Sequence, residues 1–144
     1  MLKFVPLPAP LVISQEKAIS KTVTSEPLPC RRCLKDGKRG DEMLLLSYDP
    51  FIATSPYSGT SPIFVHKKCD QYQSNGSVPE QQFKRTLSIR AYDQNHMMVD
   101  FCVIKGDLLQ ERAEEFLSQT DVAYLHIHYA GPGCFAVRVD RAVV

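Results

Sequence analysis

The sequence lacks a large net charge, long apolar runs and any complete catalytic constellation. Its 17 Lys and Arg nearly balance its 16 Asp and Glu, so no global field draws the chain to nucleic acid or to an anionic membrane. The longest apolar runs are strand-sized, far short of the roughly 20 residues that span a bilayer. Prolines interrupt the apolar N-terminus and no cleavage motif follows, which argues against a signal peptide. We therefore expect an intracellular, cytoplasmic protein.

The composition is that of an ordinary globular chain. Hydrophobic residues make up 44% and charged residues 23%, which is typical of a domain with a packed core. A chain of 144 residues can bury such a core without covalent staples. We expect the five cysteines to stay reduced, because structural disulfides are rare inside cells and an odd number argues against a full disulfide framework.

Short apolar and alternating runs predict an α+β fold with a mainly antiparallel sheet. We predict about six strands, at residues 42–48, 63–65, 87–92, 97–104, 122–129 and 135–139. One substantial helix follows Asp107, which offers an N-cap, with Gln110 at the capping-box position. Residues 77–85 predict one or two helical turns. Proline-rich residues 1–28 predict a partly ordered arm, which leaves 29–144 as a single domain.

The best chemical lead is a pair of metal-ligand spacings. Cys30 and Cys33 form a C-x-x-C motif, and His66 and Cys69 form an H-x-x-C motif. Zinc prefers thiolate and imidazole ligands in a tetrahedral shell, and structural sites use four of them. Two predicted strands and a loop separate the pairs, so the two segments can meet. The sequence therefore predicts a zinc knuckle, whose histidine needs a hydrogen-bond acceptor that the sequence does not identify.

Two other interpretations of these cysteines stay open. A redox C-x-x-C would follow a strand and open a helix in a βαβ unit, whereas Gly37 and Gly40 soon follow Cys33 and no helix pattern appears. The cysteines could also be ordinary thiols without a metal. One C-x-x-C motif alone is weak evidence for a metal site. The second pair at ligand spacing is what favours zinc.

Basic side chains gather around the predicted zinc site. They are Arg31, Arg32, Lys35, Lys38 and Arg39, with Lys67 and Lys68 in the second segment. Metal knuckles with basic loops occur in proteins that bind phosphate or nucleic acid. Three thiolates and one zinc ion carry a net negative charge, so part of the positive charge balances the cluster. Asp36 and Asp41 dilute the patch, so we favour a solvated loop over nucleic-acid binding.

Three residues near the C-terminus form a separate candidate site. His126 and His128 alternate on a predicted strand and share one face, whereas Leu125 and Ile127 share the other, core-facing one. For the histidines we favour a solvent-facing position with polar partners over a metal, phosphate or acid–base role. Cys134 follows a predicted turn, where either histidine could lower its pKa and make it a nucleophile.

Several phrases of the chain together resemble one known family. They are PCRRCL at 29–34, EMLLLSYDPF at 42–51, SPY at 55–57, SPIFVH at 61–66, RAYD at 90–93, MMVD at 97–100 and AYLHIHYAGPGCFAVRVDR at 123–141. The combination covers most of residues 29–142 and resembles the domain of unknown function 1203. The resemblance implies a small stand-alone domain whose activity is not established.

The resemblance also implies where a shared function would lie. In some members of that family, Val-Ser follows Pro-Cys-Arg, so the second cysteine of the C-x-x-C motif is absent. These members also lack the H-x-x-C pair. The resemblance thus implies that zinc belongs to a subset of members, in a structural role. A shared function would lie near Cys30, Arg31, Tyr57 and Cys134.

We predict a non-catalytic, zinc-stabilised binding or interaction module. Four protein ligands would close the zinc shell and leave no position for a substrate water. The candidate binding residues are Arg31 and Tyr57. The alternative is a cysteine-dependent enzyme or redox protein that uses Cys30 or Cys134. Its candidate catalytic residues are Cys134, Cys30, Arg31, His126 and His128.

Overall fold

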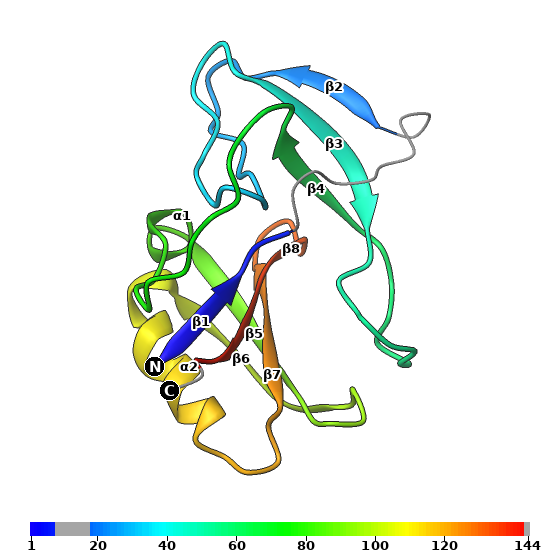
Figure 1. Ribbon diagram of the computed structural model, residues 1–144, viewed down its shortest axis with the longest axis vertical. Coiled ribbons are helices and arrows are strands. Elements are labelled where there is room, and N and C mark those ends of the chain that lie inside the picture. The colour runs from blue at the N-terminus through cyan, green and yellow to red at the C-terminus, as the bar shows by residue number, and fades with distance from the viewer. Residues whose placement is uncertain (8–17, 143–144) are drawn as a thin grey trace.

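The computed structural model describes residues 1–7 and 18–142, in which strands predominate over helices (Figure 1). No helix in these two ranges is long and apolar enough to cross a membrane. The elements are β1 (Leu2–Val5), β2 (Ile19–Thr22), β3 (Glu42–Tyr48), β4 (Ser61–His66), α1 (Glu80–Phe83), β5 (Thr86–Tyr92), β6 (Met98–Lys105), a 3-10 turn (Gly106–Leu108), α2 (Leu109–Leu117), β7 (Tyr124–Tyr129) and β8 (Phe135–Arg141).

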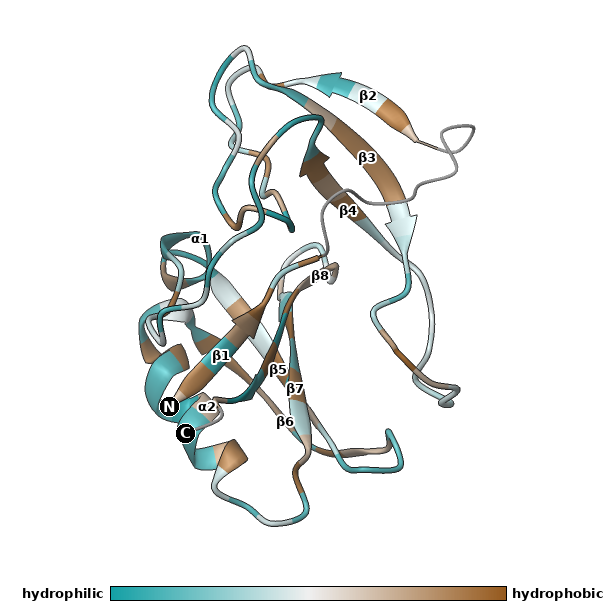
Figure 2. Cartoon of the chain, viewed as in Figure 1, coloured by the Kyte–Doolittle hydropathy of each residue, from teal (hydrophilic) through white to brown (hydrophobic). Residues whose placement is uncertain are grey.

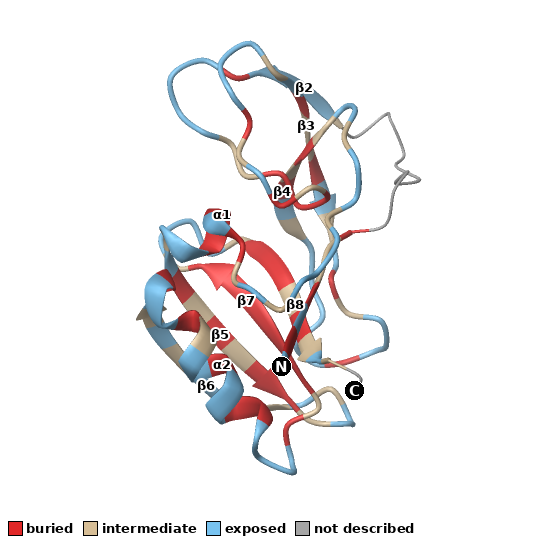
Figure 3. Ribbon diagram, turned by 60° about the vertical axis from the view of Figure 1, so that its left-hand side comes forward, coloured by how far each residue is buried: buried red, intermediate tan, exposed pale blue. Residues whose placement is uncertain are grey.

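The larger of two sheets has five strands in the order β1-β8-β7-β5-β6, and each neighbouring pair is antiparallel. Alternation along β5 places Leu87 and Ile89 on one face, since successive side chains point to opposite sides of a strand. Helix α2 buries its apolar stripe, which includes Leu109, Ala113 and Phe116, in the same core. Figure 3 shows the buried residues of β5 and β7 and the exposed outer side of α2.

The smaller sheet has three antiparallel strands in the order β2-β3-β4. It has a separate and smaller core that includes Met43, Ile63 and Val65, with Cys30 buried among them. Figure 2 shows the apolar residues that run along β3 and β4. The first of the four predicted metal ligands is therefore part of this second core.

The two sheets meet where β4 and β8 begin. The backbone N–H of Phe135 donates to Oγ of Ser61 over 2.8 Å. The backbone N–H of Arg31 donates to the carbonyl of Phe64 in β4 over 3.0 Å, and Nε of the same arginine donates to the carbonyl of Phe135 over 2.8 Å. Arg31 is therefore hydrogen-bonded to both sheets.

The predicted α+β class is confirmed, with mainly antiparallel sheets and one substantial helix. Within the described ranges the chain forms eight strands, and the helical turn predicted in 77–85 forms α1. The additional strands are β1 and β2, of four residues each. Such short strands carry little pattern of their own and are defined by their partners, β8 and β3. The boundary between an arm at 1–28 and a domain at 29–144 stays a prediction.

Helix α2 begins differently from its predicted cap. Asp107 lies inside the 3-10 turn, and α2 begins at Leu109 without a side-chain cap. The side chain of Gln110 instead donates to Oε1 of Glu114 over 2.6 Å. The predicted capping box is therefore wrong, because the 3-10 turn continues the helical conformation one turn towards the N-terminus.

Candidate metal centre

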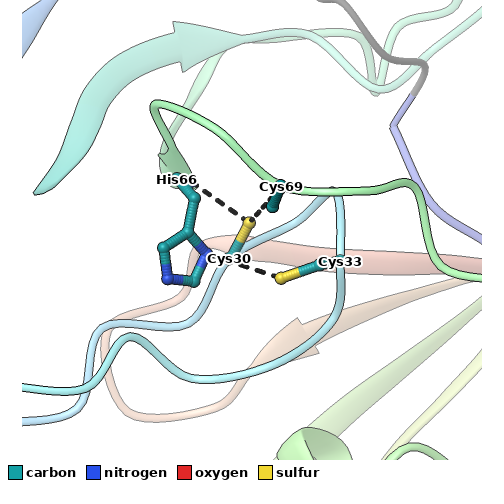
Figure 4. A group of neighbouring side chains, drawn as sticks. All are labelled: Cys30, Cys33, His66 and Cys69. Atoms are coloured by element: carbon teal, nitrogen blue, oxygen red, sulfur yellow. Dashed lines mark hydrogen bonds between the residues drawn. The ribbon is translucent and has the colours of Figure 1, made fainter. Parts of the chain in front are cut away.

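Two distant segments bring the four predicted ligands together (Figure 4). Cys30 forms a β-bridge with Phe64 in the middle of β4, which places the turn to Cys33 beside that strand. Strand β4 then ends at His66, and Cys69 follows shortly after it. The ligand atoms of the four residues all lie within 4.8 Å of one another, so this group could hold a metal ion.

Two distances match the edges of a tetrahedral zinc shell. With Zn–S bonds of about 2.3 Å and a Zn–N bond of about 2.0 Å, two sulfurs lie roughly 3.8 Å apart, and a sulfur and a nitrogen about 3.5 Å apart. Sγ of Cys30 and Sγ of Cys69 are 3.8 Å apart, and Sγ of Cys33 lies 3.4 Å from Nδ1 of His66. The donor set and its spacing therefore fit zinc.

A carboxylate orients the histidine of this group. Nε2 of His66 lies 3.0 Å from Oδ2 of Asp41, and the backbone N–H of Lys38, together with His66, holds the pKa of Asp41 below its usual value. When Nε2 donates its proton to the carboxylate, Nδ1 keeps a lone pair that faces Cys33. Such carboxylate–histidine pairs are typical of metal ligands, and the sequence did not identify Asp41 as the partner.

The thiols of the group hold their protons unequally. Hydrogen bonding with the Cys33 thiol lowers the pKa of Cys30 to about 4, although burial acts in the opposite direction. The same hydrogen bond raises the pKa of Cys33, and burial raises the pKa of Cys69. The backbone N–H of His66 also donates to Sγ of Cys30 over 3.2 Å. Because metal-bound cysteines are thiolates, binding of a cation at this group would release protons from the thiols.

The predicted basic patch is smaller than the sequence indicated. Arg31 and Arg32 are both buried, so neither belongs to a solvated loop. Arg32 points back towards the metal ligands, where Nη1 lies 3.5 Å from the carbonyl of His66. Asp36 forms ion pairs with Lys84 and Arg85 instead of diluting a patch. The reason is that the C-x-x-C turn folds inward against β4 and carries its two arginines with it.

The Cys134 thiol is hydrogen-bonded to an arginine and, among the described residues, to no histidine. Nη2 of Arg31 donates to Sγ of Cys134 over 3.1 Å. The same guanidinium donates through Nη1 to the carbonyl of Pro29, and it lies 5.2 Å from the ring centre of Tyr129. Burial lowers the pKa of Arg31, and no carboxylate within the described ranges forms an ion pair with it. Arg31 therefore brings one of the candidate nucleophiles into contact with a buried cation.

The expectation that His126 and His128 face solvent is wrong for both, because both are buried. The expectation of polar partners is wrong for His126. His126 is fully buried and neither ring nitrogen has a hydrogen-bond partner among the described residues. His128 is also buried, but its Nδ1 lies 2.9 Å from the carbonyl of Gly133, so this ring has a polar partner. The loop between β3 and β4 covers this face of the sheet. The ring of its Phe51 lies edge-on to the ring of His126, and the two ring centres are 4.8 Å apart. The prediction that Leu125 and Ile127 are core residues is confirmed.

Several of the predicted binding and catalytic residues lie together in a second place, away from the four candidate metal ligands. Tyr57, on the loop between β3 and β4, lines a pocket of about 250 Å³ together with His128 and Cys134. Arg31 lines a neighbouring pocket that shares Cys134 with the first. Sequence reasoning missed Arg90, which also lines the Tyr57 pocket, although the alternation of β5 places it on the polar face of that strand.

Comparison with known proteins gives a family and nothing more specific. Residues 27–141 match the model of a family described as "Protein of unknown function (DUF1203)". No curated protein and no solved structure matches the chain. The matched range contains all four candidate ligands and both pockets.

Proposed function

The chain belongs to the DUF1203 family, and from its cysteine–histidine cluster we propose that it is a zinc-stabilised binding module. The observation that carries the proposal is the agreement of the Cys30–Cys69 and Cys33–His66 distances with a tetrahedral zinc shell. Four protein ligands close that shell, so zinc would hold the fold and would not activate a water.

The ligand types support zinc over other ions. Three thiols with one imidazole suit zinc, whereas magnesium and calcium prefer oxygen ligands. Asp41 would fix the tautomer and orientation of His66 through its contact with Nε2. Iron–sulfur clusters use mostly thiolate ligands, and an aromatic nitrogen at one corner is less usual for them.

Zinc would also position the binding residues. The metal would tie the turn of Cys30 and Cys33 to the end of β4, and Arg31 lies inside that turn. From there the arginine extends to Phe135, the first residue of β8, and to Cys134 directly before it. We therefore place the metal in a supporting role, with the binding surface at the junction of the two sheets.

The proposal is tested by metal content and stability together. We expect about one zinc per chain in tag-free protein by mass spectrometry. Replacement Cys33→Ser should remove most of the zinc and lower Tm by about 5 °C or more, because metal binding contributes directly to folding. Cys102→Ser is the matched control, since Cys102 lies on β6 outside the group.

The control variant should keep its zinc and most of its stability. A wild-type protein with no zinc, and with all five cysteines equally reactive to a thiol reagent, would refute the proposal. Full zinc in Cys33→Ser would also contradict it, because it would place the metal elsewhere.

A second candidate function rests on Cys134. Its thiol accepts a hydrogen bond from Arg31 and lines two pockets. A cysteine that lines a pocket can act as a nucleophile towards a bound electrophile. The chain would then be a cysteine-dependent enzyme or redox protein, with Cys134 as its nucleophile and Arg31 as the residue that orients the thiol.

Alkylation rates separate this candidate from the first. If it holds, iodoacetamide should modify Cys134 at pH 7 about tenfold faster than a free cysteine, and Arg31→Met should remove that advantage. Cys102, partly buried beside the larger core, is the internal reference. If Cys134 reacts no faster than Cys102, the enzyme candidate fails while the zinc proposal is unaffected.

A further inference from the structure

A pocket of about 250 Å³ lies between the β3–β4 loop and the sheet face that α2 does not cover. Its lining includes Phe51, Tyr57, Ser61, Arg90, His128 and Cys134. Arg90 and His128 reach it from β5 and β7, which are neighbouring strands. The loop contributes the aromatic wall and β4 contributes its first residue. The pocket is smaller than the roughly 300–1,000 Å³ usual for drug-sized ligands, so it suits a small metabolite.

The lining of this pocket, called here the Arg90 pocket, is positively charged. No aspartate or glutamate contributes to it. Within the described ranges, the ion pairs involve other arginines and lysines, and Arg90 is in none of them. Arg31 is hydrogen-bonded to Cys134 and lines the neighbouring pocket, and within the described ranges it also forms no ion pair with a carboxylate. A concave site with charge of one sign concentrates the field on a ligand of opposite sign.

His128 holds Arg90 in place without neutralising it. Nδ1 of His128 lies 2.9 Å from the carbonyl of Gly133, so Nδ1 carries the proton and donates it. Nε2 is then free to accept from Nη1 of Arg90, which lies 3.4 Å away. Burial lowers the pKa of His128 to about 4, so the ring is neutral near pH 7. The guanidinium is thus oriented by a neutral acceptor and keeps its full charge.

Other groups of the lining suit an oxyanion with a small carbon skeleton. Oγ of Ser61 accepts a hydrogen bond from the backbone N–H of Phe135. The hydroxyl proton of Ser61 is therefore left to donate to a ligand oxygen. Tyr57 adds a second hydroxyl group to the lining. The rings of Phe51 and Tyr92, 5.0 Å apart, supply apolar surface beside the charge. An arginine fork can bind two oxygens of a carboxylate or a phosphate at once.

We propose that the Arg90 pocket binds a small anion that carries a carboxylate or a phosphate group. The anion pairs with Arg90, accepts hydroxyl protons from the lining and rests its carbon atoms against the aromatic wall. This inference rests on the binding role proposed above and names its ligand class. It depends on the Arg90 pocket and not on the metal ligands, so it can fail while the zinc proposal stands.

The test uses the full chain and two probes, inorganic phosphate and acetate. Each is titrated into ¹⁵N-labelled protein while backbone and arginine side-chain signals are followed by NMR. We expect saturable shifts at Tyr57, Arg90 and Gly133, and Kd should rise with ionic strength. The probe that binds more tightly identifies the anion as phosphate-bearing or carboxylate-bearing.

The matched variants are Arg90→Gln and Arg112→Gln. Arg90→Gln should weaken binding by about tenfold or more, because it removes a charge-assisted pair. Arg112 pairs with Glu115 on the exposed side of α2, so its replacement should leave Kd unchanged. If Arg90→Gln does not fold, Arg90→Lys keeps the charge but loses the fork, and we expect it to weaken binding as well.

Two results would overturn the inference. One is the absence of saturable shifts with either probe at low ionic strength. The other is equal affinity in the wild type and in the folded Arg90 variant. Zinc content is measured on the same samples, so a zinc-free protein that still binds the anion would count against the zinc proposal alone.

Discussion

At the scale of single residues, His126 is the most unusual side chain of the molecule. It is fully buried, both ring nitrogens lack hydrogen-bond partners within the described part of the chain, and four aromatic rings surround it. Burial lowers the pKa of His126 to about 3, and the neighbouring positive groups act in the same direction. The folded protein therefore holds this histidine neutral in conditions where the unfolded chain protonates it.

This predicts a loss of stability in mild acid. The pKa of an unfolded histidine is about 6.5, so between that pH and pH 3 the unfolded state binds one proton more than the folded state. The free energy of unfolding should therefore fall as the pH falls, by up to about 1.4 kcal/mol per pH unit from this group. Urea unfolding at several pH values between 7 and roughly 4 measures the slope.

The variant His126→Phe isolates this contribution. It keeps an aromatic ring among aromatic rings and removes the two unpaired nitrogens, so the stability at pH 7 should be kept or raised. Its pH slope should be shallower than that of the wild type. The four candidate metal ligands are the same in both proteins and should contribute equally to both slopes. Identical slopes would show that His126 does not titrate as described.

Asp41 gives a second prediction at this scale. Its carboxylate contacts Nε2 of His66, so Asp41→Asn should weaken zinc binding by about 10–100-fold, as the loss of such partners typically does. Competition with a chromophoric chelator measures the affinity. Asp121→Asn, at an exposed position after α2, is the control and should bind zinc like the wild type. Equal affinities in both variants would remove Asp41 from the metal site.

The group of four candidate metal ligands could be predicted from the sequence, whereas the residues that contact them could not. Cys30, Cys33, His66 and Cys69 were found because ligand pairs have a recognisable spacing. Asp41 lies 25 residues from His66, and nothing in its surroundings marks it as a partner. Contacts between residues so far apart in sequence depend on the tertiary fold, and the spacing of residues within a short motif carries no information about it.

At the scale of elements, one glycine sets the path from β6 into α2. Gly106 begins the 3-10 turn, and its N–H donates to the carbonyl of Arg85 over 2.7 Å. A Cβ atom at this position would collide with the backbone oxygens of Gln82, Phe83 and Arg85. The close approach of this turn to α1 therefore requires a residue without a side chain.

We expect Gly106→Ala to destabilise the protein by about 2 kcal/mol or more, because backbone must move to admit the methyl group. Chemical denaturation of the variant and the wild type measures the difference. Gly131→Ala is the control, since a methyl group at that position would have nothing within 4 Å of it. A change below about 0.5 kcal/mol in Gly106→Ala would mean that the turn relaxes without cost.

How well an element was predicted depended on its length and on the clarity of its apolar pattern. The alternation in 87–92 and the stripe of α2 predicted those elements correctly, because each has one buried face. Strand β2 is exposed along its whole length, so it shows no alternation that a sequence pattern could reveal. The cap at Asp107 failed because local signals cannot distinguish a helix start from a preceding 3-10 turn.

At the scale of the whole molecule, the two sheets differ in how much core they have. The larger sheet packs against α2, whereas the smaller sheet has the smaller core, of which Cys30 is part. Small structural units with little core are the ones that depend on a metal. The proposed zinc should therefore stabilise the two sheets unequally.

This predicts a local effect of metal removal. After treatment with a chelator, amides of β3 and β4 should exchange with deuterium much faster, while those of β5 and β7 should keep most of their protection. Hydrogen-exchange mass spectrometry of treated and untreated protein measures this by segment. A uniform increase across both sheets would contradict the unequal dependence, and no change in either would argue against a structural metal.

The burial of both faces of β7 could not be predicted, because it depends on a loop from the other sheet. The pattern of β7 indicated one buried face, yet β7 is buried along its whole length. The β3–β4 loop supplies the cover, through Phe51 against His126. A proline-containing loop has no periodicity, so its residues carry no pattern that indicates which surface it covers.

The pairing of β1 with β8 has a consequence for the order of folding. Leu2 pairs with Arg141, so β1 leaves the ribosome long before its partner strand exists. Contacts between residues so distant in sequence close slowly. The segment from Cys30 to Cys69 is complete much earlier, and the contacts among its four ligands need nothing from β8. We expect the smaller sheet and its metal ligands to assemble during synthesis, and the larger sheet to close only once β8 has emerged.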